Sequence, residues 1–293
     1  MGELYPDAEV IGTDLSVSRQ TPTNISLSRF VHFAKRSKAI QRTSIPSSFD
    51  PKASHGNCDE EHRVGLSSKL ILNVLKSATA IPTNVYFEID DAEDETGWTF
   101  PPSSFDLIHL RSLAGCFQSW PSIYASCLAT LRPGGWIEVI DFEDWTCPSF
   151  SSYFSPTSPI HDFLGTIKSC CEKIGRPRSQ AHLSIDMLRD IGFAECFLKR
   201  WEAPIGNWPK DEGGRGMGKL WLLAILEGFE ALGLRLLTKE AGWSAQEVMN
   251  CCQRLREELM GIVKSGKGDG MAAGVKVLTG RKPFTDEDTT KGK

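Results

Sequence analysis

Residues 105–142 read FDLIHLRSLAGCFQSWPSIYASCLATLRPGGWIEVIDF and combine two kinds of apolar pattern. The two ends of this stretch, Phe105–Leu110 and Trp136–Phe142, are short apolar runs of the kind that form buried strands. Between them, Ser119 opens a predicted helix, whose apolar side chains recur every three or four residues. A Pro-Gly-Gly triplet at 133–135 is predicted to end this helix and to turn the chain. The stretch therefore predicts a strand, a helix and a second strand.

The same alternation of strands and helices extends in both directions. Upstream, Glu9–Asp14 (EVIGTD) and Val85–Asp90 (VYFEID) are strand candidates. Downstream, Ser184–Ile191 is a helix candidate, and Glu195–Ile205 is a strand-like stretch. Strands that alternate with helices are typical of α/β proteins, in which a mostly parallel sheet is covered by helices on both faces. We therefore expect an α/β fold.

The C-terminal third of the chain is predicted to be helical. One long apolar helix is expected at about Lys219–Thr238, and another begins at Ser244. Ser244 and Glu247 have the spacing of a capping box, in which the side chain of each residue accepts a hydrogen bond from the backbone N–H of the other.

The composition argues against several classes of protein. The 293 residues contain 33 Lys and Arg against 37 Asp and Glu, a net charge of −4, which argues against nucleic-acid binding through a basic surface. The longest apolar run, near Leu220–Leu226, is far shorter than a membrane span, and the N-terminus shows no apolar secretory signal. Nine cysteines without a C-x-x-C pair indicate reduced thiols in an intracellular protein of the cytoplasm or nucleus, with no disulfide framework and no metal site.

Acidic residues stand where three of the predicted strands end. They are Asp14, the pair Asp90 and Asp91, and Asp141. In open α/β sheets, ligands bind beyond the carboxyl ends of the strands. A carboxylate there can accept hydrogen bonds from both ribose hydroxyls of a nucleotide cofactor, which orients the ligand as well as binding it. The alternative for Asp14 is that it caps a turn or a helix.

Residues 84–143, which include NVYFEIDDAEDE and the LRPGGWIEVIDFE segment, resemble the class I S-adenosylmethionine-dependent methyltransferases. More narrowly, they resemble the fungal LaeA-like group, as do YPDAEVIGTDLS near the N-terminus and CCEKIGRPRSQAH, APIGNWPKD and GRKP further on. The resemblance covers about residues 4–16 and 82–283. It implies a Rossmann-like, mostly parallel sheet, S-adenosylmethionine as cofactor, and methyl transfer in fungal secondary-metabolite biosynthesis or its regulation.

The resemblance also assigns roles to individual residues of this chain. Asp14 would bind the ribose of S-adenosylmethionine, and Asp91 with the backbone of Ala92 would face the adenine edge. The cofactor-binding positions that the resemblance implies are Asp14, Asp90, Asp91 and Ala92.

His109 and Arg111 are the catalytic candidates that the resemblance implies. They would line the mouth where the methyl group meets its acceptor, with His109 as the candidate base. Two alternatives stay open, because His109 can be a half-buried histidine with its own partner in a strand, and Arg111 can be a surface residue or part of an ion pair. We expect a small-molecule or protein acceptor, with a protein partner as a further option, and neither nucleic acid nor a membrane.

The chain departs from the family pattern at one point. The family places a first strand and a G-x-G-x-G turn before the second strand, and this first strand lies between the second and fourth strands of the sheet. No such turn precedes Glu9–Asp14, and the G-x-G-x-G at Gly214–Gly218 follows no predicted strand, so we do not expect it to bind a cofactor. The alternative function is therefore a catalytically degenerate methyltransferase fold that serves as a binding or regulatory protein.

The predicted domain organisation has four parts. Residues 1–16 hold the second strand of the methyltransferase core, and residues 17–81 are an atypical insert that is expected to be loop or disordered. Either this insert is a retained non-coding stretch, or it is genuine and a run such as Lys69–Lys76 (KLILNVLK) fills the vacant strand position. Residues 82–283 form the rest of the core with a C-terminal helical cap, and residues 284–293 form a disordered tail.

Overall fold

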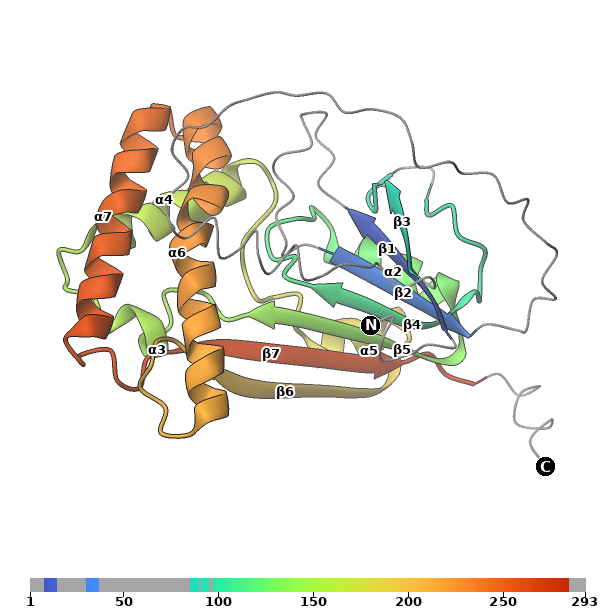
Figure 1. The fold of residues 1–293 in the computed structure, drawn as a ribbon. Coiled ribbons are helices and arrows are strands. Elements are labelled where there is room, and N and C mark those ends of the chain that lie inside the picture. Colours follow the sequence, from blue (N-terminus) through green and yellow to red (C-terminus); the bar gives the residue numbers. More distant parts are fainter. Residues whose placement is uncertain (1–7, 15–29, 37–84, 90, 95–96, 285–293) are drawn as a thin grey trace, which may run out of the picture.

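The computed structural model describes residues 8–14, 30–36, 85–89, 91–94 and 97–284 (Figure 1). In this part of the chain a single sheet of seven strands has the order β3-β1-β2-β4-β5-β7-β6. The strands are β1 (Ala8–Asp14), β2 (Phe30–Arg36), β3 (Val85–Ile89), β4 (Phe105–Arg111), β5 (Leu131–Phe142), β6 (Ala194–Pro204) and β7 (Ala272–Arg281). The helices are α2 (Trp120–Thr130), α3 (Pro148–Ser151), α4 (Pro159–Lys173), α5 (Ile185–Ile191), α6 (Glu212–Glu240) and α7 (Ala245–Lys264).

Five of the seven described strands point in the same direction. β1 is parallel to β3, and β4 is parallel to β5. β2 is antiparallel to both β1 and β4, and β7 is antiparallel to both β5 and β6. Because these two strands alone are reversed in the described sheet, β1, β3, β4, β5 and β6 run together. The expected α/β fold with a mostly parallel set of strands is confirmed.

The unit predicted at residues 105–142 is present as β4, α2 and β5. The side chain of Ser119 caps α2 by accepting a hydrogen bond from a backbone N–H of the first turn, over 3.3 Å. The prediction for the Pro-Gly-Gly triplet was wrong, because α2 ends before it and the triplet lies inside β5. Gly134 has a φ of +78°, and the register of β5 against β4 shifts across the triplet. The triplet therefore forms an irregularity within a strand.

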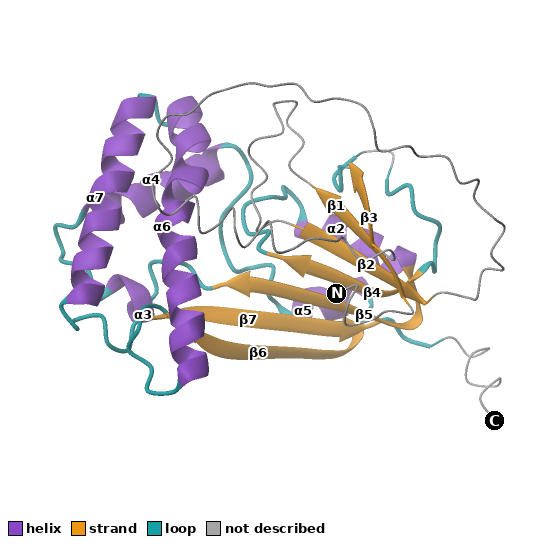
Figure 2. Ribbon diagram, in the orientation of Figure 1, coloured by secondary structure: helices purple, strands orange, loops and turns teal. Residues whose placement is uncertain are grey.

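Helices α2 and α5 cover one face of the sheet, behind it in the view of Figure 2. The opposite face is more open, because Phe197 and Trp201 of β6 point to it and are 55% and 52% exposed. Helix α6 lies near this face, and the ring of its Trp221 packs against the ring of Phe142 in β5. On this face the expected helical cover is therefore partial, because α6 contacts β6 only near one end and most side chains of β6 stay exposed, as far as the described residues go. The core under α2 and α5 includes Ile108, Leu110, Tyr124, Cys127, Ile137, Val139, Leu188 and Leu278.

Helices α3, α4, α6 and α7 form a helical lobe beside the end of the sheet at which β5 ends (Figure 1). The capping box is confirmed, since Ser244 Oγ accepts from Glu247 N–H over 3.2 Å and Glu247 Oε2 accepts from Ser244 N–H over 2.7 Å. Within the described ranges, no helix combines the length and the apolar character that crossing a bilayer requires. The core of the lobe includes Phe163, Ile167, Ile225, Phe229, Leu255 and Leu259.

The G-x-G-x-G motif lies in the first turns of α6. Asp211 caps this helix, and its Oδ1 accepts a hydrogen bond from Gly214 N–H over 2.7 Å. A Cβ at Gly218 would overlap the carbonyl oxygen of Gly206, in the loop after β6. The motif therefore lets α6 pack closely on that loop, which is a structural role.

The strand position between β1 and β4 is occupied by β2, which comes from the segment expected to be loop or disordered. Phe30 pairs with Arg111 of β4, and Arg36 pairs with Ala8 of β1, so β2 runs against both neighbours. The expected candidate for this position, Lys69–Lys76, lies outside the described residues. The ladder groups of β1 and β4 thus find a partner strand, as buried backbone groups must.

Candidate functional site

The carboxyl edge of the sheet, where β1, β3, β4, β5 and β6 end, brings two of the predicted acids together. The register of the parallel neighbours β1 and β3 places Asp14 beside Ile89. Asp91 follows Ile89 by two residues. Because neighbouring strands lie about 4.8 Å apart, Asp14 and Asp91 stand at adjacent strand ends. Asp90 lies outside the described residues.

Asp91 and Ala92 open a compact turn beyond β3. Asp91 Oδ1 accepts a hydrogen bond from Glu93 N–H over 3.0 Å, and the carbonyl of Ala92 accepts one from Trp98 Nε1 over 3.0 Å. Asp91 is exposed, whereas Ala92 and Trp98 pack against the core under α2. A carboxylate offers about four lone-pair sites, so the bond to Glu93 leaves Asp91 able to accept donors from a ligand.

Glu93 fastens this turn to the start of α2. Its Oε1 accepts the backbone N–H of Gln118 over 2.6 Å and that of Ser119 over 3.3 Å, where a negative charge suits a helix N-terminus. Its Oε2 lies 2.6 Å from Nη1 of Arg176, which also donates to the carbonyl of Cys116. Sequence reasoning missed both charged residues, although the acidic run DDAEDE and the segment GRPR were visible signals.

His109 lies within β4 and is paired through its side chain. The register places it between His32 of β2 and Glu138 of β5. Its Nδ1 is 2.8 Å from Glu138 Oε1, and its side chain is 12% exposed. This hydrogen bond holds the pKa of Glu138 below its usual range. The contact matches the interpretation of a half-buried strand histidine, and the role of His109 as a base stays a prediction.

Arg111 is the last residue of β4, and its side chain is exposed at the carboxyl edge. The next residue, Ser112, has a φ of +57°, in the left-handed region that residues other than glycine seldom adopt. Its N–H donates to the carbonyl of Ile140 over 2.9 Å. Arg111 thus enters a sharp turn, and its proposed contact with a methyl acceptor stays a prediction.

Asp141, the acid at the end of β5, turns inward and is 3% exposed. Its Oδ2 accepts the N–H groups of Leu113 over 3.1 Å and Ala114 over 2.7 Å, and its Oδ1 accepts that of Phe142 over 2.8 Å. Asp141 therefore holds the turn that follows β4. The sequence predicts this acid at a strand end but assigns it no role, because the backbone N–H groups of the turn after β4 reach Asp141 only in the folded chain.

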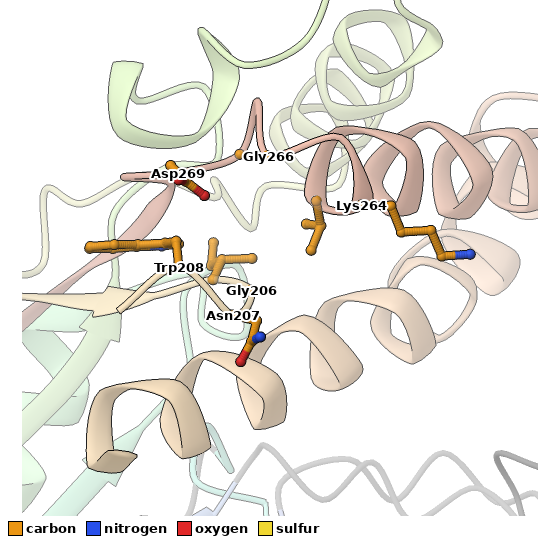
Figure 3. A pocket seen from close by; sticks show the side chains of 9 residues that line it. Gly206, Asn207, Trp208, Lys264, Gly266 and Asp269 are labelled. Atoms are coloured by element: carbon orange, nitrogen blue, oxygen red, sulfur yellow. The ribbon is translucent and has the colours of Figure 1, made fainter. Parts of the chain in front are cut away.

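A pocket of about 220 Å³ lies near the end of β6 and the start of β7, and Figure 3 shows the side chains that line it. It lies between the loop after β6, with Asn207 and Trp208, and the segment before β7, with Lys264 and Asp269. In the strand order, β7 is four positions from β1, which corresponds to roughly 19 Å. Ligand pockets usually measure about 300–1,000 Å³. This pocket is therefore too small and too remote to hold the adenosyl group expected beside Asp14.

Comparison with known proteins finds relatives in fungi. Over 185 residues the chain is 35% identical to methyltransferase pytC of Aspergillus terreus, and the match covers 61% of this chain and 54% of pytC. Over 187 residues it is 30% identical to the secondary metabolism regulator LAE1 of Cochliobolus heterostrophus, with 61% and 58% covered. The chain is thus similar to LaeA-like fungal methyltransferases, and it spans about half the length of the curated relatives it matches.

No model of a protein family matches the chain. Among solved structures, a Haemonchus contortus phosphoethanolamine N-methyltransferase 2 in complex with S-adenosylhomocysteine is 13% identical, with a TM-score of 0.37. The likeness covers 72% of this chain and 40% of that structure.

Proposed function

We propose that this chain takes part in S-adenosylmethionine-dependent methyl transfer, in fungal secondary-metabolite biosynthesis or its regulation. Its relatives support the proposal, since one is named a methyltransferase and another a regulator of secondary metabolism. The observation that carries it is the register of β1 and β3, which brings Asp14 and Asp91 to adjacent strand ends. An adenosyl group offers two ribose hydroxyls and an adenine amine as donors, and neighbouring carboxylates are suitable acceptors for them.

We propose that residues at these two strand ends hold the adenosine end of the cofactor. Asp14 would accept the ribose hydroxyls, and the exposed carboxylate of Asp91 would accept the adenine amine. At the position where the family carries its glycine-rich turn after a parallel strand, this chain has β2, which runs the other way. β2 therefore begins, at Phe30, at the carboxyl edge where the other strands end. The proposal assigns no described residue to the methionine end of the cofactor.

Bound S-adenosylmethionine supplies a methyl group that is already activated by its sulfonium. The chain then has to orient the acceptor and take up a proton. The carboxylate of Glu138 accepts a hydrogen bond from Nδ1 of His109, which fixes the ring tautomer in which Nε2 carries the lone pair. We propose His109 Nε2 as the base and exposed Arg111 as a contact for a polar acceptor.

One observation favours the second function, a binding or regulatory protein on a degenerate methyltransferase fold. The reversed strand β2 takes the place of the family's first strand, after which the cofactor turn would come. A chain built in this way can keep the sheet and lose the turn. The relative LAE1, which is named a regulator, is compatible with either function.

Equilibrium binding of labelled S-adenosylmethionine tests the proposal. We expect micromolar affinity, weakened at least about tenfold by Asp14→Ala and by Asp91→Ala, because each change removes a charged hydrogen-bond acceptor. Asp190→Ala is the matched control. Asp190 is exposed near the end of α5, close to where β6 begins, and so lies away from the carboxyl edge of the sheet. A chain that keeps its circular dichroism spectrum and binds no S-adenosylmethionine would overturn the enzyme proposal and favour the degenerate one.

We also propose an intracellular location, in the cytoplasm or nucleus, and a small-molecule or protein acceptor. The cysteines support the location, because all eight in the described residues are free thiols, six of them buried. A tagged protein recovered from the culture medium with oxidised cysteines would contradict it.

A further inference from the structure

Asp141 and His182 form a buried polar pair that the proposed chemistry does not use. The first stands at the end of β5, and the second lies in the segment between α4 and α5; they are 3% and 2% exposed. His182 Nε2 lies 3.3 Å from Asp141 Oδ2, an ion-pair distance, although in the described structure this nitrogen has no well-aligned hydrogen bond. Burial of such a pair is costly unless its surroundings stabilise both charges.

The partners of Asp141 favour its ionised form. Its oxygens accept three backbone N–H groups, from Leu113, Ala114 and Phe142. Hydrogen bonds donated to a carboxylate stabilise its charge. A buried carboxylate is also stabilised by a nearby cation, and among the described residues the basic side chain within ion-pair distance of Asp141 is the ring of His182.

The partners of His182 favour a ring that is protonated on both nitrogens. Its Nδ1 is 3.1 Å from the carbonyl oxygen of Ser179, which can accept only, so Nδ1 carries a proton. Its Nε2 faces the carboxylate of Asp141, which also can accept only. The ring stacks on Trp120 with centroids 4.1 Å apart and planes 13° apart, and an indole face attracts a cation. All three contacts suit an imidazolium.

This pair acts on the turn that follows β4. Ser112 has a left-handed φ of +57°, a strained conformation that the surroundings must hold. The next two residues, Leu113 and Ala114, are the ones whose N–H groups Asp141 accepts. The turn connects Arg111 with the start of α2. Asp141 therefore fastens a strained turn directly beside the residue that is proposed to contact the acceptor.

We propose that Asp141 and His182 are positioning residues, a buried carboxylate–imidazolium pair that holds residues 112–114 and sets the acceptor side of the carboxyl edge. The role on the acceptor side rests on the proposed function, whereas the pair itself does not. The segment that supplies His182 also supplies Arg176, which is bonded to Glu93 on the cofactor side. One segment thus clamps two turns of the carboxyl edge.

Nitrogen NMR of the histidine rings at pH 7 tests the protonation of the pair. We expect the two ring nitrogens of His182 to have the similar shifts of a protonated ring. His182→Gln identifies the signal, and His161→Gln, which changes an exposed histidine of α4, leaves it in place. A neutral His182 ring, with two widely separated nitrogen shifts, would overturn the pair.

Amide exchange tests whether the pair holds the turn. In Asp141→Asn we expect the amide hydrogens of Leu113 and Ala114 to exchange at least about tenfold faster, because a charged acceptor is replaced by a neutral one of the same shape. Asp190→Asn is the control and is expected to leave both rates unchanged. If Asp141→Asn does not fold, His182→Gln serves in its place. Unchanged exchange at both amides refutes the positioning of the turn.

Titration with S-adenosylhomocysteine separates a positioning role from a structural one. If the turn borders the site, binding shifts the ring signals of His182 and leaves those of His161 in place. We expect His182→Gln to keep the Kd for this ligand within about threefold, because the substitution is remote from the adenosine end. Binding without any shift at His182 overturns the positioning role. No binding at all overturns the proposed function, while the ion pair is still decided by the NMR and exchange results.

Discussion

Replacing Gly218 with alanine is expected to destabilise the helical lobe, although alanine is the better helix former. Gly218 is buried in α6, where an added Cβ would overlap the carbonyl oxygen of Gly206 and stand 3.2 Å from its carbonyl carbon. These are backbone atoms, which cannot rotate away as the end of a side chain can. The N–H of Gly206 also donates to the carbonyl of Gly218 over 2.9 Å, which holds the loop after β6 against this part of α6.

The size of the effect follows from two opposing contributions. Alanine in the interior of a helix is more favourable than glycine by about 0.8–1 kcal/mol. Overpacking against a rigid neighbour costs about 1–3 kcal/mol. Because the overlap here is with backbone, the cost lies in the upper part of that range. We therefore expect Gly218→Ala to lower the free energy of unfolding by about 1–2 kcal/mol.

Gly216→Ala is the matched control, because Gly216 lies in the same helix and its added Cβ would meet nothing within 4 Å. This change is expected to stabilise the protein by about 0.5–1 kcal/mol. Urea denaturation followed by circular dichroism measures both variants. If Gly218→Ala proves as stable as Gly216→Ala, the packing argument is refuted. If either variant weakens S-adenosylmethionine binding, the motif is not purely structural.

Three further predictions concern single side chains. The hydrogen bond from His109 lowers the pKa of Glu138. The stabilisation from this carboxylate is therefore present above its unfolded-state pKa of about 4.3 and is lost as the pH falls through its folded-state pKa. Glu138→Gln should flatten the curve of unfolding free energy against pH below roughly pH 5. Tyr124→Phe should lower the free energy of unfolding in urea by about 1–3 kcal/mol, because the buried hydroxyl donates to a backbone carbonyl over 2.7 Å. Burial raises the pKa of the Cys252 thiol to about 11, so iodoacetamide should label Cys252 far more slowly than the partly exposed Cys147.

Each of these predictions has a contrary result that can be measured. An acid limb of the stability curve that is the same with and without Glu138 would contradict the argument from its hydrogen bond. A Tyr124→Phe variant with the urea midpoint of the wild type would show that the hydroxyl is not needed. Mass spectrometry of labelled peptides that finds Cys252 and Cys147 modified at equal rates would contradict the burial argument.

The sequence alone predicts the elements that depend on neighbours along the chain. Apolar periodicity predicts β4, α2 and β5, and the spacing of Ser244 and Glu247 predicts the start of α7, where the structure has both hydrogen bonds of the box. These signals are local, because helix periodicity and capping involve residues a few positions apart. The positions of the acids at the ends of β1 and β3 can be predicted from the sequence for the same reason, because they directly follow local strand patterns.

Strand partners and strand direction are decided by the tertiary structure. The run FVHFAKR at Phe30–Arg36 sits in a polar segment and carries no signal for its direction. It becomes β2 through pairing with β1 and β4, which present ladder groups on both sides. The Pro-Gly-Gly triplet is likewise drawn into β5, where the backbone of Gly134 bonds that of Lys282.

The sequence by itself determined that acidic side chains stand at several strand ends, which made an adenosyl site a reasonable expectation. Only the tertiary structure decided that Asp91 faces solvent while Asp141 turns inward to meet His182. The physical reason is that the charge state and role of a carboxylate depend on its burial and on the groups around it. Those groups come from segments far apart along the chain, and they meet Asp141 only after the sheet and its connecting turns have formed.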